Sequence, residues 1–247
     1  MKIDKVLWSS SVEYCDFWNV NSMVHNKFLG LDCVLLLYGK KSECNVSEEY
    51  GQVVECEFEE GVPDIPQLVF NKWHYTRNEP ETTWLIGDID QIPLQKEHFV
   101  DSIKNVPEDH YVHLAEDAFT VNWKTKRERL VGHYHVAKGK VFNEALDLNV
   151  SLVDHVKNMV FGSQKEKKSI WAYEEWYTAD LIKANNYLNK FTGVSRSPRM
   201  KIDRQFNCSF DSSPSNKNNY VDIHCPRPFK KNKAQIEEVL SHFWGRI

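Results

Sequence analysis

The sequence predicts an α/β protein that folds as one domain, and three observations support this. Strand-like and helix-like segments alternate between residues 5 and 87, which is the pattern of a parallel sheet with crossover helices. Asp32–Tyr38 (DCVLLLY) is apolar on both faces, as a central strand covered from both sides must be. The chain has 247 residues, 41% apolar and 27% charged, which is enough for one core of its own.

The elements of the first half follow from apolar spacing and from turn residues. Residues 14–29 carry Phe17 and Trp18 at the start of a helical pattern, and Gly30 ends that helix. Pro66 opens a second helix. The expected order is strand 5–10, helix 14–29, strand Asp32–Tyr38, strand 52–58, helix 67–77 and strand 83–87.

The second half alternates less regularly. The residues 209–219 (SFDSSPSNKNN) have the composition of a loop. No internal repeat divides the chain. We expect helices at 97–104, 140–146, 152–160, 173–184 and 232–244, and strands at 110–114, 119–123, 132–137 and Tyr220–His224.

Charge and composition exclude several classes of protein. Lys and Arg number 31 against 35 Asp and Glu, so the formal net charge of −4 gives no general argument for binding nucleic acid. The start, MKIDKVLWSS, lacks the apolar run of a signal peptide, and no apolar run approaches the roughly 20 residues of a membrane span. The six cysteines form no CxxC pair. We therefore expect reduced thiols and a cytoplasmic protein without a transmembrane segment; peripheral membrane attachment through the last helix stays open, as does the oligomeric state.

Two aspartates follow a predicted buried strand. Asp88 and Asp90 lie two residues apart after strand 83–87, and in an extended backbone such residues point to the same side. Parallel sheets bind ligands at the carboxyl ends of their strands. Paired carboxylates there suit a hard divalent cation, Mg²⁺ or Mn²⁺, which would in turn hold a pyrophosphate group. An acidic surface turn is the alternative interpretation.

The segment WLIGDIDQIPL resembles the D-x-D segment of glycosyltransferases with the GT-A fold. Short further segments match that family in the required order, so the resemblance covers most of the chain. It implies a mixed central sheet flanked by helices in a single domain 1–247. Residues 1–94 would form the nucleotide-sugar-binding half that ends in the D-x-D. Residues 95–247 would form the acceptor half, with a metal ligand near its end.

The resemblance also assigns candidate site residues. Ser9 and Ser10, at the end of the first strand, look like the site that grips the nucleoside. The stretch GHYHVAKGKVF is similar to the acceptor-side strand and turn, and IWAYEEWYTADL to the segment that supplies the catalytic carboxylate. YVDIHCPRP resembles the segment whose histidine completes the metal site. The implied residues are Gly132, His133, Lys138, Gly139 and Trp171 for the donor or acceptor sugar, Glu175 and Glu174 for catalysis, and Asp88, Asp90 and His224 for the metal, with Arg227 beside the diphosphate.

These residue types fit transfer of a hexosyl or pentosyl group from a nucleoside diphosphate to a hydroxyl of a glycan. Negative charge grows on the departing diphosphate, and a divalent cation stabilises it. An imidazole ligand from His224 favours Mn²⁺ over Mg²⁺. Glu175 would act as general base or as nucleophile, according to whether configuration inverts or is retained. The resemblance favours UDP as the nucleotide.

Other interpretations remain open at this point. Acidic residues in a first helical turn, such as Glu174 and Glu175, also stabilise a helix without catalysis. Lys72 could pair with a donor phosphate or with a surface carboxylate, and His133 or His135 could line an acceptor pocket or be ordinary strand residues. The alternative functions are a sugar-nucleotide pyrophosphorylase, a non-catalytic carbohydrate-binding relative and, least favoured, an enzyme that glycosylates modified DNA bases.

Overall fold

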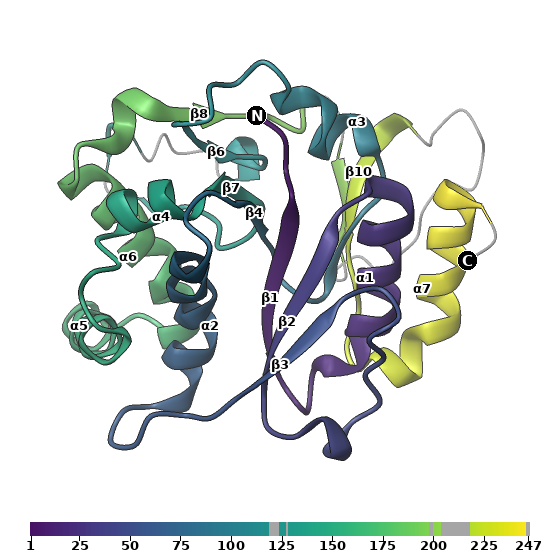
Figure 1. The fold of residues 1–247 in the computed structure, drawn as a ribbon, viewed down its shortest axis with the longest axis horizontal. Helices are drawn as coiled ribbons and strands as arrows, with labels where there is room; N and C mark the ends of the chain where they lie inside the picture. Colours follow the sequence, from purple (N-terminus) through teal and green to yellow (C-terminus); the bar gives the residue numbers. More distant parts are fainter. Residues whose placement is uncertain (119–123, 127, 198–199, 204–217, 246–247) are drawn as a thin grey trace.

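The structure is a computed structural model, and it describes residues 1–118, 124–126, 128–197, 200–203 and 218–245. Its centre is a seven-stranded sheet in the order β3-β2-β1-β4-β7-β6-β8, beside a three-stranded sheet in the order β5-β10-β9 (Figure 1). The strands are β1 Lys5–Ser11, β2 Asp32–Tyr38, β3 Gln52–Cys56, β4 Thr83–Ile86, β5 Gln91–Pro93, β6 Tyr111–His113, β7 His135–Lys138, β8 Phe191–Gly193, β9 Met200–Asp203 and β10 Tyr220–His224.

Seven α-helical segments among the described residues surround the sheets. Some of them are extended by single turns of tighter or wider helix, as where α1 continues into a π-helical turn at His25–Leu29. The α-helices are α1 Trp18–Val24, α2 Asp64–Tyr75, α3 Lys96–Phe99, α4 Gly139–Leu146, α5 Leu152–Glu166, α6 Ile170–Ala184 and α7 Phe229–Trp244.

The central sheet is mixed, as expected. Strand β1 runs parallel to both β2 and β4, and β2 runs parallel to β3. Strand β7 is antiparallel to its neighbours β4 and β6. This arrangement places a strand from the second half of the chain directly against one from the first, so residues from both halves meet at the same edge of the sheet.

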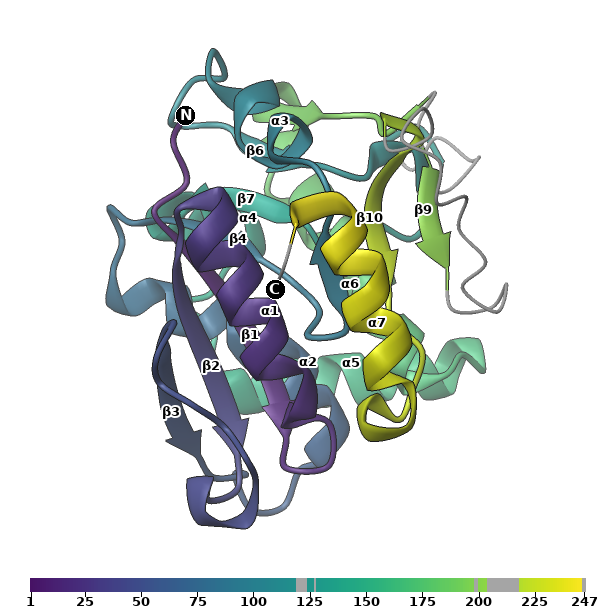
Figure 2. The ribbon, with the colours of Figure 1, turned by 90° about the vertical axis from the view of Figure 1, so that its right-hand side faces the viewer.

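Both faces of the sheet are buried, which explains the continuous apolar run in β2. Leu35 and Leu37 face one core together with α1 and α7, while Val34 and Leu36 face the other core together with α2, α4, α5 and α6. The two groups of helices lie on opposite sides of the sheet in Figures 1 and 2. The alternation follows because neighbouring side chains in a strand point to opposite faces.

Most predicted elements are present, with changed ends. The bounds of β2 and β10 agree with the prediction, and Gly30, at φ 74°, ends the first helical segment as expected. Helix α2 begins at Asp64, before the predicted start, and α5 continues to Glu166. The short strands β5, β8 and β9 were not predicted. The strand expected at 119–123 and nearly all of the loop expected at 209–219 lie outside the described residues.

The strand expected at 132–137 begins only at His135, which makes that prediction wrong for its first three residues. Tyr134 has a positive φ of 63°, a backbone conformation that no strand residue adopts. The chain therefore turns at Tyr134 before it enters β7. None of the helices within the described ranges has both the length and the apolar character that a bilayer crossing requires.

Candidate active site

A cleft of about 530 Å³ lies at the carboxyl ends of β1 and β4. Strand β4 ends at Ile86, and the chain then turns through Asp88–Ile89–Asp90 into β5. Gly87 is needed at the start of this turn, because a Cβ there would lie 2.7 Å from the indole nitrogen of Trp8. Among the residues that line the cleft are Ser9, Ser10, Tyr14, Lys72, Asp88, Asp90, Gln91, Gly132, His133, Trp171, Glu174, Glu175, Arg196, Lys201, His224 and Arg227.

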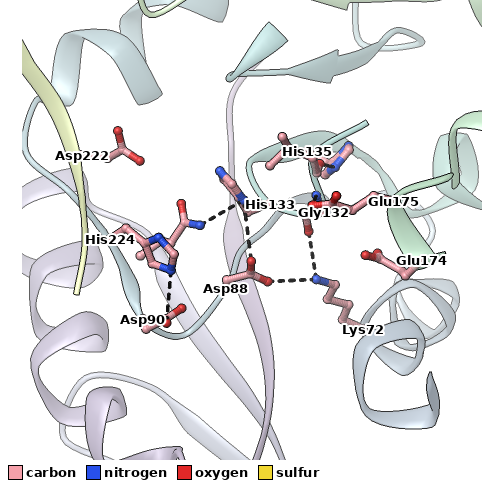
Figure 3. A network of polar contacts seen from close by, with 12 residues as sticks. Lys72, Asp88, Asp90, Gly132, His133, His135, Glu174, Glu175, Asp222 and His224 are labelled. Atoms are coloured by element: carbon pink, nitrogen blue, oxygen red, sulfur yellow. Dashed lines mark hydrogen bonds and ion pairs between the residues drawn. The ribbon is translucent and has the colours of Figure 1, made fainter. Parts of the chain in front are cut away.

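Asp88 lies on the cleft floor between two nitrogen groups (Figure 3). Its Oδ1 is 3.3 Å from Lys72 Nζ and its Oδ2 is 3.6 Å from His133 Nδ1. Burial acts to raise the pKa of the carboxyl, but Lys72 and His133 more than offset it and hold the pKa below its ordinary value. Asp88 is thus an ionised carboxylate at neutral pH.

Lys72 is a buried lysine on α2, and its ammonium group lies beside Asp88 beneath the cleft. Its side chain is 4% exposed, and its ammonium donates to Gly132 O at 2.9 Å and to Asp88 Oδ1. Burial alone would lower the pKa of this group, but the nearby Asp88 carboxylate raises it above the ordinary value, and Glu174 adds to this effect when it is ionised. The chain therefore keeps a fixed positive charge beneath the cleft.

Asp90 is almost fully buried and is contacted by two basic side chains. Arg227 contacts its Oδ2 through Nε at 2.7 Å and through Nη2 at 2.6 Å, and His224 Nε2 lies 3.4 Å from the same oxygen. Burial acts to raise the pKa of Asp90, and the contacts with His224 and Arg227 lower it below its ordinary value. Three ligands of the predicted site, Asp88, Asp90 and His224, thus line one cleft.

The turn that carries the two aspartates is fixed by hydrogen bonds to its backbone carbonyls. Asn21, fully buried on α1, donates its amide to Ile89 O at 2.9 Å and to Gln91 O at 3.1 Å. The amide of Cys225, just after β10, donates to Asp90 O at 2.8 Å. Elements far apart in the sequence therefore hold the carbonyl groups on both sides of Asp90, which limits the positions its side chain can take.

Glu174 and Glu175 reach the cleft from α6, on the side opposite Asp90 (Figure 3). Glu174 is 4% exposed and accepts a hydrogen bond from Trp73 Nε1 at 3.0 Å. Glu175 accepts from the Gly132 amide at 3.2 Å and lies 3.4 Å from Arg129. Burial raises the pKa of each carboxyl to about 7. Both protonation states of this pair are therefore accessible near neutral pH, as a proton-transferring group requires.

Gly132 connects the lysine with the glutamate pair. Its carbonyl accepts from Lys72, its amide donates to Glu175, and a Cβ on it would lie 2.5 Å from Glu174 Oε2. Glycine is therefore required for Glu174 to come this close. His133, the next residue, is buried and positioned by Gln91, whose Nε2 is 3.1 Å from His133 Nδ1. Burial lowers the pKa of His133 below its ordinary value, although the neighbouring Asp88 acts to raise it.

The remaining predicted residues divide between the cleft and the rest of the fold. Ser9 and Ser10 line the cleft, although their hydroxyls also donate to the carbonyls of Leu68 and Ser11. Trp171, 47% exposed in the first turn of α6, lies on the cleft wall.

Lys138 and Gly139 do not belong to the cleft. Lys138 pairs with Glu108 at 2.6 Å, and a Cβ on Gly139 would lie 2.2 Å from the carbonyl of Thr76. Gly139 is thus a packing glycine at the start of α4. His135 is likewise a core residue: it is fully buried and bonded to Tyr111 at 2.9 Å.

The sequence left Lys72 open between a donor phosphate and a surface carboxylate, whereas the structure pairs it with the cleft carboxylate of Asp88. The role of Asn21 was not predicted. One signal for Lys72 was available in the pattern of α2: it lies three residues after Val69, on the side of the helix that is buried, where a surface lysine is not expected. Asn21 gives no such signal, because its partners are carbonyls about seventy positions away in the chain.

The donor set of the cleft fits a divalent cation by its chemistry. Asp88 and Asp90 supply hard carboxylate oxygens, and His224 supplies an imidazole nitrogen, a combination that suits Mn²⁺. Within the described parts of the chain, no three His, Cys, Asp or Glu side chains are arranged together as a metal site. Instead each aspartate is paired with a cationic side chain, Lys72 or Arg227.

Comparison with known proteins finds similar solved structures but no similar sequences. No protein-family model matches the chain, and neither does any curated protein sequence. The apo form of the glycosyltransferase GlyE from Streptococcus pneumoniae TIGR4 is similar, with a TM-score of 0.51 and 10% identity over 91% of this chain and 54% of that chain. The chain shares its overall fold with that glycosyltransferase. The galactosyltransferase LgtC, solved with donor and acceptor sugar analogs, has a TM-score of 0.48 and 10% identity over 91% of this chain and 87% of that chain.

Proposed function

We propose that this protein is a metal-dependent glycosyltransferase that moves a sugar from a nucleoside diphosphate, UDP in our assignment, to a hydroxyl of a glycan. One observation carries the proposal. In a single cleft, an aspartate pair suited to a divalent cation faces a buried Glu174 and a half-buried Glu175, whose pKa values lie near 7. The glycosyltransferase fold supports it, because such enzymes act on donor and acceptor sugars.

Asp88, Asp90 and His224 would hold the cation. When bound, it supplies Lewis-acid stabilisation of the negative charge that grows on the departing diphosphate. Lys72 adds a fixed positive charge beneath the cleft floor, where its effect is strengthened by burial. Ser9 and Ser10 lie at the end of β1, where the nucleoside would bind.

The glutamate pair would supply the reacting carboxylate. Glu175 is oriented by the Gly132 amide and by Arg129, and Glu174 is oriented by the Trp73 indole. In its ionised form such a carboxylate takes the proton of an acceptor hydroxyl or stabilises the positive charge on the transferred sugar. Trp171 offers an exposed ring face on the cleft wall for an acceptor sugar.

A thermal-shift screen tests the donor assignment. Nucleotide sugars with UDP, GDP and TDP are added with and without Mn²⁺, and the UDP-sugars are expected to raise the unfolding temperature only with the metal. Asp90→Asn should abolish this shift and donor turnover, whereas Asp101→Asn, a surface aspartate paired with Lys104, should change neither. If no nucleotide sugar binds with Mn²⁺, or if Asp90→Asn turns over donor normally, the proposal is wrong.

Acceptor transfer tests the role of the glutamates separately. Glu175→Gln should lower sugar transfer by about two orders of magnitude or more and leave the Mn²⁺-dependent thermal shift in place. Donor binding without any turnover in the unchanged protein would instead indicate a carbohydrate-binding relative.

A further inference from the structure

One carboxylate oxygen of Asp90 has an unusual set of neighbours. Its Oδ2 lies 2.7 Å from Arg227 Nε, 2.6 Å from Arg227 Nη2 and 3.4 Å from His224 Nε2. A carboxylate oxygen offers few lone-pair directions, and here Arg227 uses two contacts to the same atom. A cation that binds Asp90 through this oxygen has to compete with the guanidinium for it.

The two members of this ion pair differ in burial. The Asp90 side chain is 2% exposed, so it is costly to leave its charge without a partner. The Arg227 side chain is 38% exposed and lies over the ring of Tyr14, with Cζ 5.0 Å from the ring centroid, in the cleft itself. The guanidinium can therefore leave Asp90 and remain in the cleft, while Asp90 needs another cation in its place.

We propose that Arg227 is an internal counter-ion of Asp90 in the donor-free protein, and that it exchanges Asp90 for the donor diphosphate when a divalent cation binds Asp90. This inference rests on the proposed function for its donor, but the competition at Asp90 stands independently of it. The exchange needs only a side-chain movement, because β10 and the Cys225 amide hold the backbone beside Asp90.

The second ion pair of the cleft floor, between Lys72 and Asp88, differs from the pair between Arg227 and Asp90 in the exposure of its cation. Lys72 is 4% exposed and also donates to the Gly132 carbonyl, so it has no route out of the fold and stays beside Asp88. Of the two pairs, one is permanent and the other is exchangeable. A divalent cation brings two further positive charges to a floor where each aspartate already has a cationic partner. A diphosphate, contacted by the released Arg227, offsets that excess.

The proposal predicts opposite changes in two affinities. Arg227→Gln should bind Mn²⁺ about tenfold more tightly than the unchanged protein in the absence of nucleotide, because the competing cation is gone. The same variant should bind UDP at saturating Mn²⁺ about tenfold more weakly, because the diphosphate loses a partner. Free Mn²⁺ is measured by electron paramagnetic resonance, and UDP binding by titration calorimetry. Lys230→Gln, an exposed control on α7 that pairs with Asp16, should alter neither affinity.

Stability provides a second readout if Arg227→Gln is poorly folded. Because its Asp90 has lost the Arg227 guanidinium, Mn²⁺ should raise the unfolding temperature of this variant more than that of the unchanged protein. Arg227→Lys, which keeps the charge, should bind Mn²⁺ with intermediate affinity. An Mn²⁺ affinity of Arg227→Gln equal to or below that of the unchanged protein overturns the inference. Tighter Mn²⁺ binding with no UDP binding in any variant supports the counter-ion role and instead refutes the donor assignment.

Discussion

Replacing Glu174 by glutamine should change how the stability of the protein depends on pH. The folded structure raises the pKa of Glu174 from 4.5 to about 7, and burial is the main cause. The folded protein therefore binds this proton more tightly than the unfolded chain does. Glutamine has nearly the same shape and keeps an oxygen that can accept the Trp73 indole hydrogen bond, but it has no proton to lose.

The size of the effect follows from that pKa difference. Stability from the protonated Glu174 is complete below pH 4.5 and is lost as the pH rises through 7, because the unfolded chain then binds fewer protons than the folded one. At about 1.4 kcal/mol for each unit of pKa, this loss amounts to about 3 kcal/mol. Glu174→Gln has no such proton and should not lose this stability. The free energy of unfolding of the variant, relative to that of the unchanged protein, should therefore rise by about 3 kcal/mol between pH 4.5 and pH 7.5.

Urea unfolding at half-unit pH steps measures this difference. Buried histidines such as His25 and His135, whose pKa values are lowered to about 4 and about 3 by burial, act in the opposite direction, but they are common to both proteins and cancel in the difference curve. Glu166→Gln, which removes a carboxylate outside the cleft, serves as the matched control. Parallel curves for the unchanged protein and Glu174→Gln would refute the reasoning that Glu174 is a buried, protonated carboxyl.

Two further predictions concern residues that position the site. Gly132→Ala places a Cβ 2.5 Å from Glu174 Oε2 and should cost about 1–3 kcal/mol of stability together with most of the transfer activity. The added change Glu174→Ala should restore the stability. An unaltered activity in Gly132→Ala would show that the close approach of Gly132 and Glu174 is not needed for transfer. Asn21→Ala leaves two carbonyls of the aspartate turn without their donor and should lower the free energy of unfolding by about 2 kcal/mol or more and weaken Mn²⁺ binding, as measured by urea unfolding and by paramagnetic resonance. Ser22→Ala removes a hydroxyl that donates to the carbonyl of Asn19 in the same helix, and it should leave the Mn²⁺ affinity unchanged. An equal loss in both variants would remove Asn21 from its positioning role.

The fold class was predictable because its central strands carry their own signal. Asp32–Tyr38 is apolar at every position after the first, and only burial on both faces of a sheet explains such a run. The strands that were missed are three or four residues long. Strand β5 forms because Gln91 and Pro93 pair with residues of β10, far along the chain. The local sequence around β5 does not indicate this pairing.

The grouping of the candidate residues was predictable where they are neighbours in the sequence. Asp88 and Asp90 stand two apart after a buried strand, and Glu174 and Glu175 are adjacent on one helix, so local geometry already brings each pair together. Lys138 and Gly139 were assigned because they lie within the matching stretch GHYHVAKGKVF, but the turn at Tyr134 and the packing of α4 direct them away from the cleft.

The sequence by itself determined the α/β class, the strand that ends in two aspartates and the acidic pair on a later helix, because each depends on residues within a few positions of one another. Only the tertiary structure decided which charges meet. Arg227 pairs with Asp90 across 137 positions, and the Trp73 indole reaches Glu174 across 101. Charge interactions and desolvation depend on distances in space and on burial, so the protonation of the glutamates and the counter-ions of the aspartates were fixed when the sheet brought the two halves of the chain to one edge.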